Sequence, residues 1–227
     1  MRTLRPIDPL RSMRSGRSAL PGALAGLLIL LAWGCSQGTV VAGAGSSGPR
    51  TDPAADDPVE FGPLPDFQLV SERGTEVTLA TLRGRPLVVA ALFTSCSGPC
   101  PRLARSLEQL QDELRGTDVL LVAVSVDPQT DTPDVLSRYA RTHGAEPERW
   151  IFLTGEEQQV HQLVRQGFYL AVERAAPGAA DGSQGVTHDT RLLAVDRAGQ
   201  RRGWYSGIDE EGVERLRQRM LHLAAEK

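Results

Sequence analysis

The chain has 227 residues, of which 41% are hydrophobic and 23% are charged, with 25 basic residues against 28 acidic ones. This composition fits one globular domain with additional segments at an end. The formal net charge of −3 provides no basic surface for a polyanion, so we exclude nucleic acid as a partner.

Residues 1–35 are predicted to be an export signal. Five arginines precede residue 18, and a continuous apolar run follows from Ala19 to Trp33. Fifteen helical residues reach only about 22 Å, which is short of a hydrocarbon core of about 30 Å. A basic head, a short apolar middle and an end of small residues are typical of a signal for export.

The apolar run stops at Gly34-Cys35. This ending resembles the lipobox of bacterial lipoproteins, in which the cysteine is acylated and becomes the mature N-terminus. The resemblance implies lipidation at Cys35, and Ser36 fits the preference for sorting to the outer membrane. The alternative is an uncleaved membrane anchor with an incidental Cys35. Both interpretations place the domain outside the cytoplasm, in the periplasm or at the cell surface, and tethered to a membrane.

Residues 36–59 are rich in Gly, Ser, Pro and Asp and show no apolar period, so we expect a flexible linker. Residues 60–227 are predicted to form the globular domain, in which strands alternate with helices. This alternation indicates an α/β fold built as a three-layer sandwich. The expected elements are a hairpin over 67–84, strands over 86–93, 119–126 and 150–155, helices over 102–114, 132–144, 156–166 and 211–226, a loop over 174–187, and a hairpin over 191–206.

With Cys35 assigned to lipid, Cys96 and Cys100 are the remaining cysteines, in the stretch FTSCSGPCPRL. They lie where the first buried strand meets its helix, at the edge of the sheet that binds ligands in such folds. If Pro99 and Cys100 begin the helix, the cysteines are one turn apart, so they can share a metal ion or form a disulfide. The helix N-terminus is expected to lower their pKa. A bridge closing so small a loop would add little stability, which favours a chemical role.

The chain offers four histidines as further ligands. His143 lies near a helix C-terminus, and His161 and His222 lie within helices that carry no second ligand-type residue at helical spacing. We interpret these three as ordinary surface or boundary residues. His188 lies at the junction between the long loop and the strand that begins the last hairpin, and this junction can reach the cysteine edge.

Asp127 and Asp131 flank a proline turn after the second buried strand, near the same edge. Turn and cap formation is a sufficient explanation for both residues. The alternative is an indirect role behind the ligands of a metal.

Three features together resemble the SCO/SenC family: FTSCSGPCPRL, the segment SVDPQTDTPDVLSRYA over 125–140, and a histidine before the hairpin RLLAVDRAGQ. The members are thioredoxin-fold, copper-binding proteins that help to assemble the copper centre of cytochrome c oxidase. The resemblance covers about residues 61–226 and implies a thioredoxin-like fold with an N-terminal β-hairpin extension. It also implies that Cys96, Cys100 and His188 are copper ligands.

The chain departs from the family pattern at two places. The family usually has Pro-Asp-x between its cysteines, whereas this chain has Ser97-Gly98-Pro99. The family histidine commonly follows an Asp, whereas Thr187 precedes His188 here. We expect these changes to alter affinity, redox potential or partner choice and to leave the three ligand positions intact.

Two functions follow from the residues and the resemblance. The first is a copper metallochaperone, which is not an enzyme, holding Cu(I) or Cu(II) for the copper-site subunit of a respiratory oxidase or another copper enzyme. An upstream copper chaperone or a thioredoxin-like reductase would be a further partner. The alternative is a thiol–disulfide oxidoreductase that uses Cys96 and Cys100 to keep target cysteines reduced. Zinc also suits these ligand types, but a structural zinc site normally has four ligands, and the sequence offers no fourth.

Overall fold

In the computed structural model, residues 61–174 and 186–226 are described. The predicted export signal, Cys35 and the linker therefore lie outside the described residues. No helix within the two described ranges is both long and apolar enough to cross a membrane.

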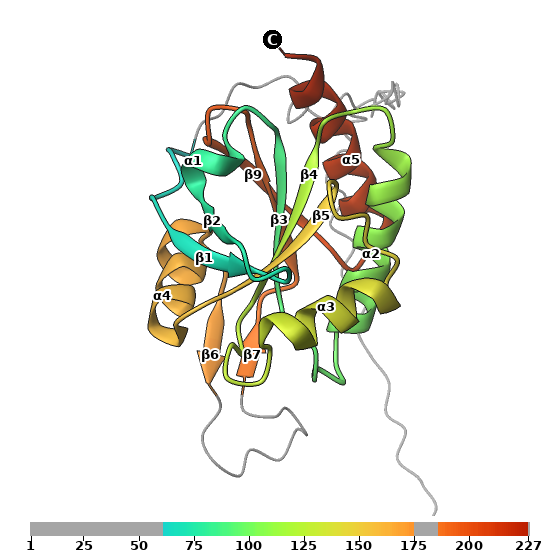
Figure 1. The fold of residues 1–227 in the computed structure, drawn as a ribbon. Coiled ribbons are helices and arrows are strands. Elements are labelled where there is room, and N and C mark those ends of the chain that lie inside the picture. The colour runs from blue at the N-terminus through green and yellow to red at the C-terminus, as the bar shows by residue number, and fades with distance from the viewer. Residues whose placement is uncertain (1–60, 175–185, 227) are drawn as a thin grey trace, which may run out of the picture. The chain divides into compact units, whose positions relative to one another are not determined.

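Strands and helices alternate along the chain, as the sequence predicts (Figure 1). The strands are β1 (Gln68–Ser71), β2 (Glu76–Thr78), β3 (Leu87–Leu92), β4 (Leu120–Ser125), β5 (Trp150–Thr154), β6 (Val172–Arg174), β7 (Val186–His188), β8 (Arg191–Val195) and β9 (Arg201–Ser206). The helices are α1 (Leu79–Leu82), α2 (Cys100–Glu113), α3 (Pro133–Thr142), α4 (Glu157–Gln162), the π-helical turn η1 (Leu163–Gly167) and α5 (Glu210–Ala225).

Seven of these strands form one mixed sheet in the order β2-β1-β5-β4-β3-β8-β9. The central strands β3, β4 and β5 run parallel, and β8 pairs antiparallel with β3. Every residue of the three parallel strands is buried. Continuous apolar runs of this kind belong to strands that are covered on both faces, so this expectation from the sequence is confirmed.

Helices cover both faces of the sheet. Figure 1 shows α2, α3 and α5 on one side and α4 on the other. Right-handed crossovers from β3 to β4 and from β4 to β5 step in the same direction, which puts α2 and α3 on the same face. The hairpin β1–β2 joins the edge through antiparallel pairing of β1 with β5. The predicted three-layer α/β fold with an N-terminal hairpin is confirmed.

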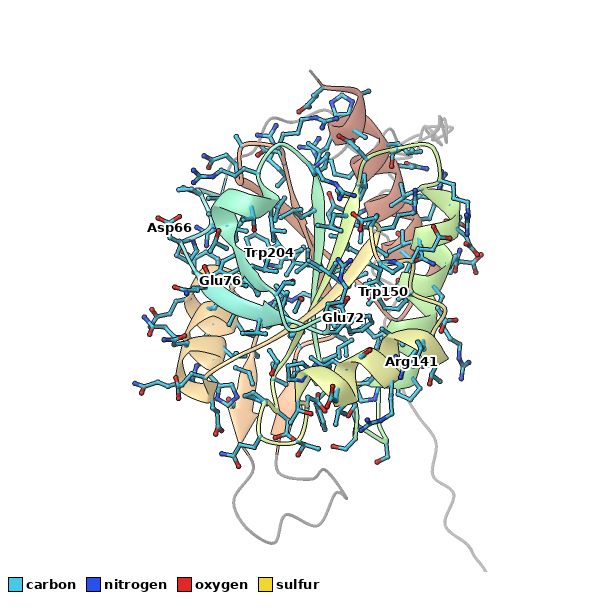
Figure 2. The ribbon with its side chains drawn as sticks, in the orientation of Figure 1. Asp66, Glu72, Glu76, Arg141, Trp150 and Trp204 are labelled. Carbon is cyan, nitrogen blue, oxygen red and sulfur yellow. The ribbon has the colours of Figure 1, made fainter. Side chains whose placement is uncertain are left out.

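Aromatic side chains fill the space between the sheet and α3. Trp150 is 1% exposed and stacks on Phe152 with ring centroids 5.0 Å apart, and Tyr139 of α3 meets Phe152 edge-on. Figure 2 shows Trp150 inside and Arg141 at the outer surface of α3. Burial of large rings supplies a large share of the hydrophobic stabilisation in such a core. This layer fixes α3 against β5.

Of the two helices that flank the cysteine edge, α3 begins where the sequence predicts and α2 begins two residues before the expected range of 102–114. Pro99 is the N-cap of α2, so Cys100 is the first helical residue. Thr132 caps α3, its side chain accepting a hydrogen bond from the Val135 N–H, and Pro133 follows at the first helical position. A proline is tolerated there because its missing N–H would have no helical partner.

Two helical segments differ from the prediction. The stretch expected to form only a hairpin contains the short helix α1, which begins with a capping box between Thr78 and Thr81. The helix expected over 156–166 changes to π-helical geometry at Leu163, where the Phe168 N–H donates to the Leu163 carbonyl. The Gly167 carbonyl accepts a hydrogen bond from Arg201 at 2.7 Å, so a tertiary contact that the local sequence does not contain fixes this turn.

The predicted loop over 174–187 was too long. Arg174 ends β6 and Val186 begins β7, and the two strands pair antiparallel in a separate two-stranded sheet. Residues 175–185 lie outside the described residues. Each strand has only three residues, too few to show the alternation that identifies a strand in sequence. The correction matters because β7 carries His188.

Candidate metal centre

The two cysteines lie at the carboxyl end of β3. Cys96 is half-buried in the loop after Phe93, and its N–H donates to the Phe93 carbonyl at 3.4 Å. Cys100 is 1% exposed at the start of α2. Both are free thiols. The strand-to-helix turn therefore presents one partly exposed cysteine and one buried cysteine at the same edge.

The hairpin β6–β7 brings His188 to that edge. His188 ends β7 opposite Val172, and the following Asp189 N–H donates to the Ala171 carbonyl at 2.9 Å. His188 is 8% exposed, and its imidazole meets the Phe93 ring edge-on, with centroids 5.6 Å apart. Backbone pairing and packing therefore hold the His188 side chain in place. The residue belongs to a strand, β7, whereas the sequence predicts a loop up to residue 187.

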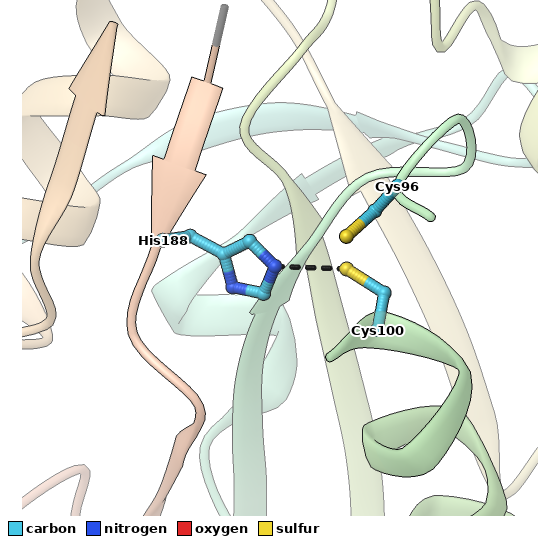
Figure 3. A group of neighbouring side chains, drawn as sticks. All are labelled: Cys96, Cys100 and His188. Carbon is cyan, nitrogen blue, oxygen red and sulfur yellow. Dashed lines mark hydrogen bonds between the residues drawn. The ribbon is translucent and has the colours of Figure 1, made fainter. Parts of the chain in front are cut away.

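The ligand atoms of Cys96, Cys100 and His188 all lie within 4.8 Å of one another. His188 Nε2 is 2.8 Å from the Cys100 sulfur (Figure 3). Among the described residues, this is the one group of three or more such side chains that could hold a metal ion. The three residues that the sequence selected come from segments up to 92 positions apart and converge on one point.

The hydrogen bonds of His188 define the tautomer of its neutral ring. Nδ1 lies 2.8 Å from the Asp189 backbone carbonyl, which can only accept, so Nδ1 carries the proton. In the neutral ring, Nε2 then presents its lone pair toward Cys100. A metal-ligating histidine in proteins usually has this arrangement, with its second nitrogen tied to a carbonyl or carboxylate.

The electrostatics of Cys100 differ from the expectation. The helix N-terminus was expected to lower the pKa of the thiol. Instead, burial raises the pKa of Cys100 well above its ordinary value, and the neighbouring Cys96 and Asp131 raise it further, whereas a backbone hydrogen bond with Phe93 opposes them. Desolvation exceeds the effect of the helix because the sulfur is almost fully enclosed.

The electrostatics of His188 agree with this picture. Burial lowers the pKa of the imidazole, although the Asp189 carbonyl and carboxylate oppose the shift. A neutral imidazole accepting from a protonated thiol is thus the resting pair at neutral pH. A soft cation would replace the proton between Nε2 and the Cys100 sulfur, so the donor set fits such a metal.

Arg191 anchors the segment that follows His188. Its guanidinium donates to the Asp189 carboxylate at 2.6 and 2.9 Å and to the Tyr169 carbonyl at 3.1 Å. Burial alone would raise the pKa of Asp189, but the hydrogen bonds from Arg191 lower it. The carboxylate next to the histidine is therefore engaged by a cation.

The other histidines lie in other surroundings. His143 Nδ1 is 2.5 Å from a Glu108 oxygen, and His161 Nε2 donates to the Val126 carbonyl at 2.8 Å. His222 is exposed on α5 and pairs with Glu226. Their interpretation as ordinary surface and boundary residues is consistent with these partners.

Asp131 makes more contacts near the cysteines than its predicted role in a turn or cap requires. Turn and cap formation is the role that the sequence predicts for it, yet Thr132 caps α3 and Asp131 is completely buried. Its carboxylate accepts hydrogen bonds from Thr94, two residues before Cys96, and from Ser125 at the end of β4. Asp127 does have the expected turn role, its carbonyl accepting from the Thr130 and Asp131 N–H groups. An acidic residue spaced four positions after the SVD motif was the available signal.

Comparison with known proteins identifies the family. The SCO1/SenC family profile matches residues 56–222, which is most of the chain. The chain belongs to the SCO1/SenC family. The SCO1 protein homolog of Bacillus subtilis (strain 168) is 27% identical over 156 residues, covering 67% of this chain and 78% of that protein.

Solved structures of SCO1/SenC proteins have the same thioredoxin-like fold. A SCO1/SenC family lipoprotein from Bacillus anthracis is 26% identical with a TM-score of 0.65, covering 72% of this chain and 95% of that one. Bradyrhizobium japonicum ScoI, solved with copper bound, is 21% identical with a TM-score of 0.59, covering 70% and 98%. At 21% identity, the second likeness supports the fold alone. The predicted fold and family are confirmed.

Proposed function

We propose that this SCO1/SenC protein is a copper metallochaperone whose ligands are Cys96, Cys100 and His188. The observation that carries the proposal is the convergence of two sulfurs and an imidazole nitrogen within 4.8 Å, with the nitrogen lone pair directed at a sulfur. Two thiolates and one imidazole suit Cu(I) and can also hold Cu(II). A relative in Stutzerimonas stutzeri, 28% identical over 163 residues and named "Putative copper-binding protein", supports copper as the metal.

The proposed recipient of the copper is inferred from the role of the SCO1/SenC family. Its role in assembling the copper centre of cytochrome c oxidase makes the copper-site subunit of a respiratory oxidase the proposed recipient. Cys96 is partly exposed whereas Cys100 and His188 are buried, so Cys96 is the ligand that a recipient's thiolate reaches first. A site with three ligands leaves room for a fourth ligand from the recipient. Copper can then pass to the recipient without being released into solution.

The experiment is an anaerobic Cu(I) titration of the reduced full chain in mild detergent, against a chromophoric chelator. We expect one copper per chain. His188→Ala should weaken binding by more than the roughly 10- to 100-fold that loss of a ligand's hydrogen-bond partner costs. His222→Ala is the matched control, because His222 is exposed on α5 and should leave the affinity unchanged.

A second function is favoured by the unequal exposure of the two sulfurs. A thiol–disulfide oxidoreductase needs one accessible cysteine for attack and one nearby cysteine that closes the disulfide. Cys96 and Cys100 satisfy this requirement. If His188→Ala retains full copper affinity while exchange with a disulfide substrate is fast, the reductase replaces the metallochaperone as the main function.

We also propose that the protein is exported and held at the membrane by lipid on Cys35. The family includes a lipoprotein in Bacillus anthracis, which supports an anchored, extracytoplasmic location. The intact mass of protein extracted from membranes measures this directly. An unmodified Cys35, or retention of residues 1–34, would contradict lipidation.

A further inference from the structure

A buried carboxylate lies behind the cysteine loop. Asp131 belongs to the loop between β4 and α3 and is 0% exposed. Among the described residues its side chain has three hydrogen-bond donors as partners and no ion pair: the Thr94 N–H at 3.0 Å, the Thr94 hydroxyl at 2.5 Å and the Ser125 hydroxyl at 2.6 Å. Bringing a carboxylate out of water without a cation is costly, so charge-assisted hydrogen bonds must offset the loss.

These bonds connect the loop that carries Cys96 to the neighbouring strand. Thr94 lies two residues before Cys96, and Ser125 is the last residue of β4. Ser125 also accepts a hydrogen bond from the Asp127 N–H at 3.2 Å, which ties it to the turn after β4. One carboxylate therefore fastens both the backbone and the side chain of Thr94 to a rigid part of the sheet.

The middle of the Cys96 loop makes few hydrogen bonds, although Cys96 packs against the core and the Pro99 carbonyl accepts from the first turn of α2. Ser95, Ser97, Gly98 and Pro99 are all exposed, and the Cys96 N–H makes one long bond to the Phe93 carbonyl. Cys100, by contrast, is fixed by the first turn of α2 and by burial. The position of Cys96 therefore depends more on the Asp131–Thr94 contact than the position of Cys100 does.

We propose that Asp131 is a positioning residue of the metal centre, which holds Cys96 within reach of Cys100 and His188 through its paired hydrogen bonds to Thr94. This inference rests on the proposed copper site. This role does not require Asp131 to touch the metal.

The test compares Asp131→Ala, Thr94→Val and the double variant in the reduced full chain. We expect Asp131→Ala to weaken Cu(I) binding by about 10- to 100-fold, the range for residues that orient ligands. Thr94→Val keeps its N–H and should lose less. The double variant should lose no more than Asp131→Ala alone, because both changes break one connection. The Cu(II) electron paramagnetic resonance spectrum should change in parallel.

Thr132→Ala is the matched control for stability. It removes the cap of α3 at the next residue, which should lower the stability of the fold, and it leaves Thr94 untouched. Its copper affinity should stay within twofold of the wild type. If Asp131→Ala binds copper with unchanged affinity and spectrum, or if Thr132→Ala loses as much affinity, the positioning role is wrong.

A second readout separates this inference from the proposed function. In a glutathione redox buffer, Cys96 and Cys100 lose two protons and two electrons to oxidised glutathione, giving one disulfide and two reduced glutathione molecules. Asp131→Ala should lower this equilibrium constant at least fivefold, because the two sulfurs meet less often. If the wild type binds no copper, the copper function fails, and an unchanged disulfide equilibrium would then reject the role of Asp131 as well.

Discussion

At the residue scale, Gly98 lies between the two cysteines, at one of the places where the chain departs from the usual family pattern. The family usually has an Asp between its cysteines, whereas Gly98 leaves no charge there. A Cβ at residue 98 would lie 3.8 Å from the Cys96 sulfur and meet nothing else within 4 Å. The space beside the accessible sulfur is therefore open, and a side chain can be added without disturbing the fold.

Restoring a carboxylate at this position should slow the chemistry of Cys96. In Gly98→Asp, the charge would disfavour the thiolate by electrostatic repulsion at short range. We expect alkylation by an uncharged reagent at pH 7 to slow at least about 3-fold, which is the repulsion of two unit charges about 6 Å apart at the dielectric constant of water. Gly98→Ala adds the same Cβ without charge and should stay within twofold. Equal slowing in both variants would assign the effect to bulk.

At the element scale, the metal centre depends on how α2 and the chain after β7 pack around Gly207. A Cβ at Gly207 would lie 2.4 Å from Leu103 Cδ1 and 2.6 Å from the Thr190 carbonyl oxygen. Leu103 lies one turn after Cys100 in α2, and Thr190 lies two residues after His188. The absence of a side chain at residue 207 thus allows the elements carrying two of the three ligands to approach each other.

Gly207→Ala should separate these elements and destabilise the domain. Overpacking against backbone typically costs about 1–3 kcal/mol, and the free energy of unfolding in urea should fall by that amount. Because the displaced segments carry Cys100 and His188, copper affinity should fall as well. Gly98→Ala is the matched glycine replacement and should change stability by less than about 0.5 kcal/mol. A Gly207→Ala protein with unchanged stability would show that the contact relaxes freely.

The pairing of β6 with β7 also belongs to this scale. In the sequence, His188 is a ligand candidate because it lies just before the last predicted hairpin. In the structure, its position is set by the pairing of β7 with Val172 and by the hydrogen bond from Arg191 to the neighbouring Asp189. Three-residue strands carry almost no local signal. Their existence depends on the neighbouring sheet and on burial of residues such as Val172, which is 2% exposed.

At the scale of the whole molecule, the metal centre joins three segments: the loop after β3, the start of α2 and the end of β7 (Figure 3). A metal that binds all three stabilises the folded state by mass action. Free copper at 100 times its Kd should add about 2.7 kcal/mol. For a domain of this size, that gain corresponds to a rise in Tm of about 5–11 °C.

This stabilisation should increase with pH. Burial raises the pKa of Cys100, so the apoprotein keeps the thiol proton at neutral pH and copper binding must release it. Each proton released makes the affinity rise about tenfold per pH unit, so at fixed free copper the Tm shift should be larger at pH 8 than at pH 6. Scanning calorimetry with and without copper at both pH values measures it. Cys100→Ser should remove the shift, and a shift independent of pH would mean that Cys100 is already a thiolate.

The sequence by itself determined the order of elements, the α/β class, the buried parallel strands and the identity of Cys96, Cys100 and His188 as ligand candidates. Apolar runs, caps and motif spacing are local signals, so they can be interpreted without the fold. Only the tertiary structure decided the β6–β7 hairpin, the π-helical turn, the raised pKa of Cys100 and the place of Asp131. Each of these depends on burial or on partners far away in the chain. For Cys100 the local helix end and the global burial oppose each other, and burial is the stronger because the sulfur is enclosed on nearly every side.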